Sequence, residues 1–311
     1  MEKRYSGRRR RHLRWLWLLM IPVLDLFGTW AGLGWYAAVA ALSLLLSQLW
    51  RLFPAAARQE LPQLLFVSAI TIVSMGAGAA VMLGREKKLS FYERPRWSDA
   101  MPLTEVFFAV LLIGIYLTSW AEALFSRFGI RWPQADIPAL HGGVMWAAAV
   151  FRYVLVPAVM EELLFRGALL HTLRPLGERG ACLTAALLFT LFHTSASHWP
   201  SIFLLGLLLC YAALHTQSLV VPMLLHAANN ALALWQSQLL LSGGQTQLAT
   251  LQLGLTVFGV SGAVFAVTYF RRGMLPRPDR SGLSMGQQLL SPLLAVVAFC
   301  LFNCISGAVT Q

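Results

Sequence analysis

Long apolar stretches, separated by short polar ones, make up most of this sequence. Most of the stretches approach the roughly 20 residues that an α-helix needs to cross the hydrocarbon core of a bilayer. The pattern predicts an all-α fold, a polytopic transmembrane helix bundle with about 8–10 membrane segments. The predicted segments are residues 15–50, 62–84, 103–125, 143–170, 179–196, 200–216, 219–241, 248–270 and 287–308.

The first apolar stretch, residues 15–50, is long enough for two crossings, but the positive charges favour one. Lys and Arg accumulate on the cytoplasmic side of membrane proteins. A single crossing places the basic N-terminus and the most basic loops, residues 85–102 and 271–280, together on that side. A kinked or interfacial piece around Asp25 would complete the stretch, and a two-span hairpin is the alternative. We expect a multi-pass protein of the bacterial plasma (inner) membrane with a cytoplasmic N-terminus.

Composition agrees with a membrane protein and argues against binding of nucleic acid. Hydrophobic residues make up 58% of the chain and charged residues 12%, whereas soluble domains carry about 25% charged residues. The net charge of +11 comes from basic residues that gather at segment ends and in the N-terminal tail, which indicates membrane topology. The four cysteines all lie in apolar stretches, without the spacing of metal ligands: Cys182, Cys210, Cys300 and Cys304.

One membrane segment contains charged residues, which are costly to place inside a bilayer. Glu161, Glu162 and Arg166 lie inside the apolar stretch 143–170. A carboxylate at membrane depth costs about 3 kcal/mol or more, so such a charge indicates a functional site by default. In an α-helix Glu162 and Arg166 share a face and can pair, whereas Glu161 is turned about 100° away and stays available for proton transfer. An internal ion pair that only positions helices is the alternative.

Two later membrane segments carry polar side chains at helical spacing. Phe189 and His193 are four residues apart, as are His226 and Asn230. Alone, each pair has a structural explanation, either a hydrogen-bonded packing histidine or a polar clamp between helices. Together with Glu161, they supply a general base, a second proton-handling group and two donors for an oxyanion.

This set of groups fits attack of water on an amide carbonyl. No Ser or Cys is obviously coupled to a base, so a covalent acyl-enzyme is not expected. We expect no cofactor. Zinc is the alternative, because Glu161, His193 and His226 would leave an open fourth position on a catalytic ion, although the usual HExxH pattern is absent.

The order and spacing of these residues resemble the CPBP family of intramembrane proteases, which includes CAAX-processing endopeptidases and many bacterial relatives. The matching motifs are Glu161-Glu162-x-x-x-Arg166, Phe189-x-x-x-His193 and His226-x-x-x-Asn230. The resemblance implies a glutamic-type endopeptidase that requires no metal. By this likeness Glu161 and His193 would activate the water. His226 and Asn230 would stabilise the oxyanion, and Glu162 with Arg166 would support the site.

We therefore expect an enzyme that hydrolyses a peptide bond of a membrane-associated protein or peptide. Its partners would be that substrate and the lipid bilayer. The prenylated-CAAX substrate is not carried over, because bacterial relatives also serve in protein sorting, peptide maturation and bacteriocin immunity. A non-catalytic CPBP-like partner or immunity protein is the main alternative, and a proton-relay transporter a further one. The chain divides into a basic cytoplasmic tail (1–14), an N-terminal membrane region (15–142), a CPBP-like catalytic core (143–241) and C-terminal membrane helices (242–311), all in one integrated membrane domain.

Overall fold

The computed structural model describes residues 59–84, 94–95, 97–130, 137–193 and 195–273, with scattered positions between 34 and 49. Helices dominate these residues, which confirms the predicted all-α fold. Five of their helical stretches are long and apolar enough to cross a membrane, so the chain is an integral multi-pass membrane protein. The predicted segment 287–308 and most of 15–50 lie outside the described residues.

The helices begin and end close to the predicted membrane segments. They are α2 (Glu60–Gly84), α3 (Trp97–Arg127), α7 (Gly177–Leu191), α8 (Trp199–Thr216), α9 (Val220–Leu241) and α10 (Gln245–Arg271). α3 starts six residues before the predicted 103, because Asp99 in its first turn suits the positive end of the helix dipole. α7 ends before the predicted 196, and the chain then turns through the short 3-10 helix η6 (Ala196–His198) into α8.

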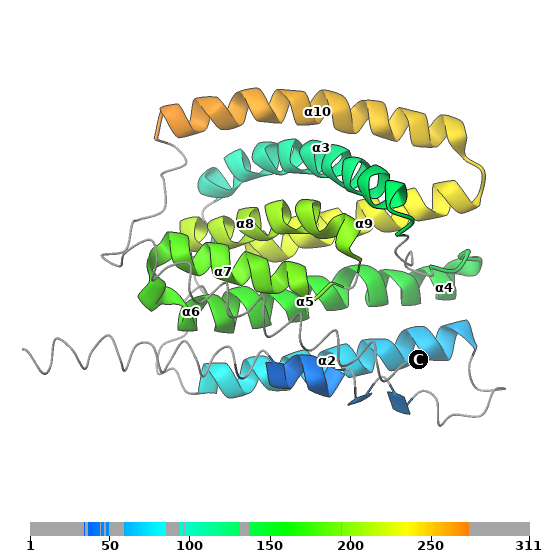
Figure 1. Ribbon diagram of the computed structural model, residues 1–311, viewed down its shortest axis with the longest axis horizontal. Coiled ribbons are helices and arrows are strands. Elements are labelled where there is room, and N and C mark those ends of the chain that lie inside the picture. The colour runs from blue at the N-terminus through cyan, green and yellow to red at the C-terminus, as the bar shows by residue number, and fades with distance from the viewer. Residues whose placement is uncertain are drawn as a thin grey trace, which may run out of the picture.

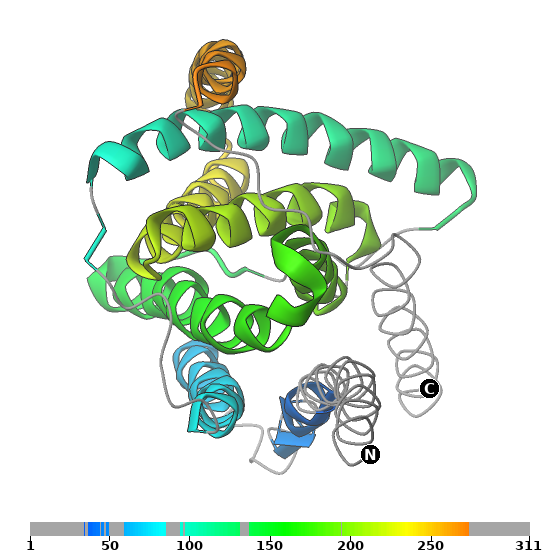
Figure 2. The same cartoon turned by 90° about the vertical axis from the view of Figure 1, so that its left-hand side faces the viewer.

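In Figure 1 the helices lie roughly side by side in layers. α2 forms one outer layer and α10 the other, with α3 beneath α10 and a central group of α4 to α9 between α2 and α3. Figure 2, turned by 90°, shows α3 running across the molecule while α10 is seen end-on, so these two helices cross obliquely. The central group lies between α2 and α3, so helices cover it on both sides. It contains all the candidate residues.

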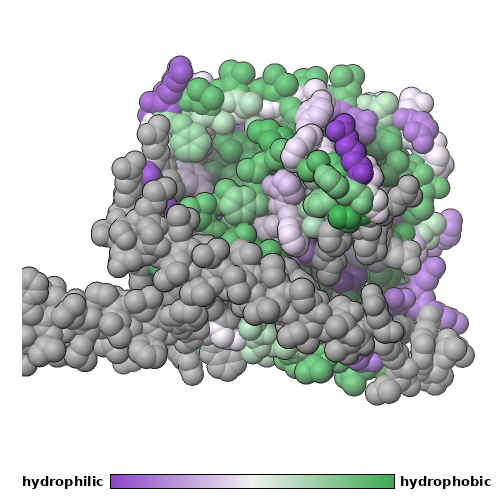
Figure 3. Space-filling model, in the orientation of Figure 1, coloured by the Kyte–Doolittle hydropathy of each residue, from purple (hydrophilic) through white to green (hydrophobic). Residues whose placement is uncertain are grey.

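The described surface fits a lipid environment. Apolar side chains cover most of the described face in Figure 3, and strongly polar ones gather mainly toward its left and right edges. Large apolar side chains of α10 are exposed, among them Leu253, Val257 and Val264. An apolar belt between polar ends is the surface expected of helices that span a bilayer.

One long helix, Gly142–Thr172, contains two π-helical sections, which wind more widely than an α-helix. It runs as α4 (Gly142–Ala149), the π-helical η3 (Val150–Leu155), α5 (Val156–Glu162), the π-helical η4 (Leu163–Leu169) and α6 (Leu170–Thr172), before the 3-10 turn η5 (Arg174–Leu176). In the first wide turn the Val156 N–H bonds to the Phe151 carbonyl, five residues back. Pro157 explains this turn, because its ring would collide with the carbonyl four residues earlier in a regular α-helix. Wide turns of this kind are frequent at functional sites, and this helix carries both candidate glutamates.

Gly262 allows α10 to approach α3 closely, and its replacement tests that contact. A Cβ built at Gly262 would collide with the backbone carbonyl of Glu105 in α3, which has no side-chain freedom to move away. We expect Gly262→Ala to lower the free energy of unfolding by about 1–3 kcal/mol. Gly254 lies on the same helix with open space around its Cβ position. Gly254→Ala should therefore leave stability unchanged or raise it by up to about 1 kcal/mol. Thermal unfolding in detergent measures both, and equal effects of the two changes would contradict the close packing.

Candidate active site

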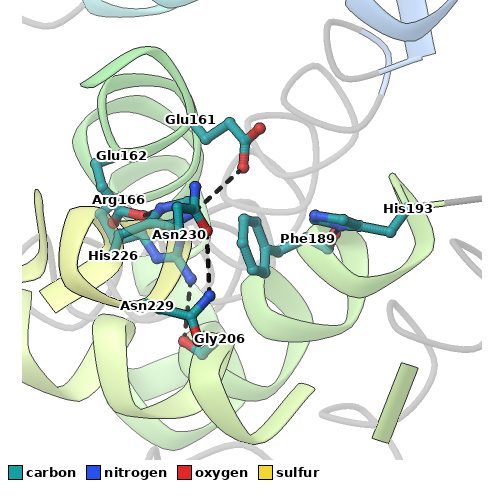
Figure 4. Close-up of polar contacts among 9 residues, drawn as sticks. All are labelled: Glu161, Glu162, Arg166, Phe189, His193, Gly206, His226, Asn229 and Asn230. Atoms are coloured by element: carbon teal, nitrogen blue, oxygen red, sulfur yellow. Dashed lines mark hydrogen bonds and ion pairs between the residues drawn. The ribbon is translucent and has the colours of Figure 1, made fainter. Parts of the chain in front are cut away.

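The candidate residues come from neighbouring helices of the central group and meet inside the bundle (Figure 4). The long helix supplies two adjacent glutamates at the end of α5 and an arginine one turn later. Three other helices supply the remaining groups. The contributors are Glu161 and Glu162 of α5, Arg166 of η4, Phe189 of α7 with His193 just past its end, the Gly206 carbonyl of α8, and His226, Asn229 and Asn230 of α9.

A fully buried ion pair anchors the site. The Nη1 of Arg166 lies 2.8 Å from Oε1 of Glu162, and neither side chain is exposed. Nη2 of Arg166 donates a second hydrogen bond to the Gly206 carbonyl at 3.1 Å. The pairing expected from the i,i+4 spacing is therefore present, although η4 winds more widely than an α-helix. Two buried charges of opposite sign need partners of this kind, because each alone would lose its hydration without compensation.

Phe189 forms the wall that the arginine packs against. The guanidinium carbon of Arg166 lies 4.4 Å from the centre of the Phe189 ring, close enough for a cation–π interaction. Gly206 makes this arrangement possible, because a Cβ there would lie 3.3 Å from the Phe189 ring and 3.2 Å from Cβ of Ala186. The close contact between α7 and α8 thus delivers the Gly206 carbonyl to the arginine.

His226 links the two glutamates. Its Nδ1 lies 2.8 Å from Oε1 of Glu162, and its Nε2 lies 3.8 Å from Oε2 of Glu161. Because a carboxylate only accepts hydrogen bonds, Nδ1 carries a proton and donates it toward Glu162. Nε2 is thereby aimed at Glu161, whose Oε2 has no hydrogen-bond partner among the described residues. The structural glutamate orients the imidazole, and the imidazole faces the other glutamate.

His193 lies on the other side of the Phe189 ring (Figure 4). Its Nδ1 is 2.9 Å from the Phe189 carbonyl, and its ring meets the Phe189 ring edge-on at 5.1 Å between centroids. The His226 ring also meets Phe189 edge-on, at 5.7 Å. Within the described part of the chain, no hydrogen bond or ion pair joins His193 to Glu161. Glu161, Glu162, Arg166 and His226 thus form one connected group, and His193 lies one ring away from it.

Asn229 is a site residue that the sequence pattern did not single out. Its Nδ2 donates a hydrogen bond to Oδ1 of Asn230 at 3.1 Å. With its oxygen occupied in this way, Asn230 has its NH₂ group left to donate. The only signal in the sequence is the doubled asparagine, and spacing alone cannot show which of the two side chains holds the other.

Arg152 is a second residue that sequence reasoning left outside the site. It lies in η3, well inside the helix Gly142–Thr172, and its charge interacts with Glu161. A regular α-helix would place residues nine positions apart on opposite faces. The π-helical turn changes that relation, and apolar periodicity cannot reveal such a turn. Arg152 therefore adds a positive charge to the surroundings of the candidate base.

The residues fit a zinc ion poorly. A zinc site built from Glu161, His193 and His226 needs both imidazoles to face one point, but the Phe189 ring lies between them. No group of three or more His, Cys, Asp or Glu side chains is arranged to hold a metal ion within the described ranges.

Comparison with known proteins assigns the central part of the chain to a family. A family model described as "Type II CAAX prenyl endopeptidase Rce1-like" matches residues 143–232. This range includes every candidate residue of the site, and it confirms the resemblance to the CPBP family that the three motifs indicated. Neither a curated protein nor a solved structure matches the chain.

Loss of Arg166 tests whether the buried pair stabilises the fold. Arg166→Met keeps an unbranched apolar stem, removes the guanidinium and leaves the Glu162 carboxylate buried without its cation, so the free energy of unfolding should fall by about 3–5 kcal/mol. The double change Glu162→Gln with Arg166→Met should recover part of that loss, because neither charge is then left alone. The control, Arg271→Met in the exposed last turn of α10, should change stability by less than about 0.5 kcal/mol. Denaturant unfolding in detergent measures all three, and equal losses for the two arginines would refute the anchoring role.

Proposed function

Because residues 143–232 match the Rce1-like family of CAAX prenyl endopeptidases and lie inside a multi-pass membrane protein, we propose that the chain is a glutamic-type intramembrane endopeptidase. Its substrate would be a protein or peptide at the membrane. The observation that carries the proposal is the position of His226 Nε2, 3.8 Å from Oε2 of Glu161 and next to the buried ion pair of Glu162 with Arg166. A catalytic base and a hydrogen-bond donor for the developing charge must lie this close, because they act on the same carbonyl group.

In the proposed reaction Glu161 is the general base. Two atoms 3.8 Å apart can both bond one water molecule at ordinary distances of about 2.8 Å, so Oε2 of Glu161 and Nε2 of His226 would hold the attacking water between them. Glu161 takes one proton from this water while the oxygen attacks the carbonyl carbon of the peptide bond. The resulting tetrahedral intermediate collapses when the carbon–nitrogen bond breaks, and the proton held by Glu161 passes to the leaving amine. The positive charge of Arg152 also interacts with this carboxylate.

The oxyanion would be stabilised by donors from α9. While Nδ1 of His226 is held by Glu162, an N–H at Nε2 would be the first donor. The NH₂ group of Asn230 supplies the second donor, oriented by Asn229. The oxyanion hole is preorganised, because both donors are held by neighbours before substrate binds.

His193 is proposed as the second proton-handling group. If the Phe189 carbonyl accepts a hydrogen bond from Nδ1, then Nε2 is the nitrogen that can pass a proton to the leaving amine. The turn that carries His193 is held in place, because the Trp199 indole donates to the His193 carbonyl at 2.8 Å. This role supplements Glu161 and requires no metal.

Replacement of Glu161 tests the catalytic role directly. Glu161→Gln keeps the size of the side chain and removes the base, so cleavage should fall by at least about 100-fold. Glu105→Gln in α3 is the control and should cleave at the wild-type rate. The assay uses purified protein in detergent with a pool of internally quenched apolar peptides, with and without a strong chelator.

Undiminished cleavage by Glu161→Gln would disprove the mechanism, and loss of wild-type cleavage on chelation would favour the zinc alternative. A biological phenotype that survives Glu161→Gln would favour a non-catalytic partner or immunity protein.

Asn229→Asp tests how the oxyanion donor is oriented. A carboxylate accepts hydrogen bonds where the amide donated one, so the Asn230 side chain should turn its NH₂ group toward it and away from the substrate. We expect kcat to fall by about 100-fold with little change in KM, since the lost bond forms only in the transition state. Asn229→Ala removes the bond without reversing Asn230 and should lose less. A rise in KM with unchanged kcat in both variants would show that Asn229 acts in substrate binding instead.

A further inference from the structure

A single glutamine side chain binds the backbone of the segment before the long helix. Oε1 of Gln238 in α9 accepts a hydrogen bond from the Leu140 N–H at 2.9 Å, and Nε2 donates to the Pro138 carbonyl at 3.0 Å. Residues 137–140, here called the 137–140 segment, belong to no helix. His141 at its end has an extended backbone, with φ −118° and ψ 126°.

The geometry of these two bonds is that of strand pairing. In a parallel sheet, one residue binds a carbonyl and, two positions later, an N–H of the neighbouring strand. The side-chain amide of Gln238 makes the same two bonds, one to a carbonyl and one to an N–H two positions later. Both bonds go to main-chain atoms. Such recognition gives affinity for an extended backbone without selecting its side chains.

The same face of α9 leads from Gln238 to the proposed active site. His226, Asn230, Leu234 and Gln238 are spaced by four residues and form one ridge along the helix. Eight residues separate Asn230 from Gln238, a rise of about 12 Å. That distance corresponds to roughly three or four residues of an extended chain. A peptide bound at Gln238 therefore reaches the oxyanion donors within a few residues.

Apolar side chains pack between this ridge and the long helix. Leu140 is one of them, packed with Ala149, Val154 and Leu234, and it is only 8% exposed. The cluster extends along α9 to Ala227, next to His226. The 137–140 segment thus packs at the Gln238 end of a row of apolar side chains, here called the track, whose other end at Ala227 adjoins His226.

We propose that this track binds the substrate as an extended apolar peptide, and that the 137–140 segment occupies it until substrate displaces it. Gln238 is the residue that holds the substrate backbone. The inference rests on the proposed function, since it names how that site receives its peptide. It is tested by binding, so that it can fail or hold independently of cleavage.

The probe is a heptapeptide of Val and Thr with a central benzoylphenylalanine, and photo-crosslinking to the full chain carrying Glu161→Gln reports its binding without cleavage. Loss of Gln238 removes a bond from the bound segment and from the bound peptide alike, so the apparent affinity for the probe alone is uninformative.

The informative quantity is the ratio of cross-linking between the probe and an analogue without N–H groups. The wild-type track should bind the probe about tenfold better than its fully N-methylated analogue, because the analogue has no N–H to donate. Gln238→Leu should reduce that ratio to about one, and Gln236→Leu on the same helix should preserve it.

Displacement of the segment gives a second, independent measurement. Hydrogen exchange at the Leu140 amide should accelerate when the probe binds, because the probe replaces this segment at Gln238. Leu140→Ala weakens the packing of the segment and should increase probe cross-linking several-fold. Each of three results would overturn the proposal. They are a selectivity ratio that Gln238→Leu leaves intact, absence of cross-linking to α9, and unchanged hydrogen exchange at Leu140. Cleavage that depends on Glu161 with none of these effects would leave the proposed function standing without the track.

Discussion

The buried pair between Glu162 and Arg166 is the interaction on which the central group of helices depends. Both side chains are fully buried in an apolar bundle, where an isolated charge is costly. Each remaining bond of the pair recruits another helix. Arg166 requires the Gly206 carbonyl from α8 and the face of Phe189 from α7, and Glu162 requires the imidazole of His226 from α9. The need to satisfy two charges therefore brings four helices to one point.

The second glutamate gains its chemistry from this arrangement. Glu161 is adjacent to Glu162 in sequence but turns to another side of the helix, where Nε2 of His226 faces it. Among the described residues, Glu162 bonds both Arg166 and His226 through Oε1, whereas Glu161 has only the longer contact with His226. Oε2 of each glutamate has no hydrogen-bond partner there. The π-helical turns on either side of α5 change the order of side chains around the helix, and the charge of Arg152 in the first of them interacts with Glu161.

Much of this could be predicted from the sequence, because apolar stretches and four-residue spacings are local features. The segments and the i,i+4 pair of Glu162 with Arg166 follow from them, and the family match over residues 143–232 agrees with the motifs. The features that escaped prediction depend on contacts between distant residues or on changes of winding. Spacing cannot show that Phe189 lies between His193 and His226, nor that Gln238 binds a segment about a hundred residues earlier. The hydrogen bond from Asn229 to Asn230 depends on side-chain orientation, which no sequence pattern encodes.

The central claim is that Glu162 holds His226 so that the imidazole faces Glu161. Solid-state NMR of the protein in proteoliposomes tests it, with ¹⁵N in histidine and ¹³C in the glutamate carboxyl groups, and with His226→Asn to identify the His226 signal. The account predicts a strong dipolar coupling from Nδ1 of His226 to one glutamate carboxyl carbon, which disappears in Glu162→Leu, and a weaker one from Nε2, which disappears in Glu161→Leu. A His226 signal without coupling to either carboxyl carbon would contradict the account.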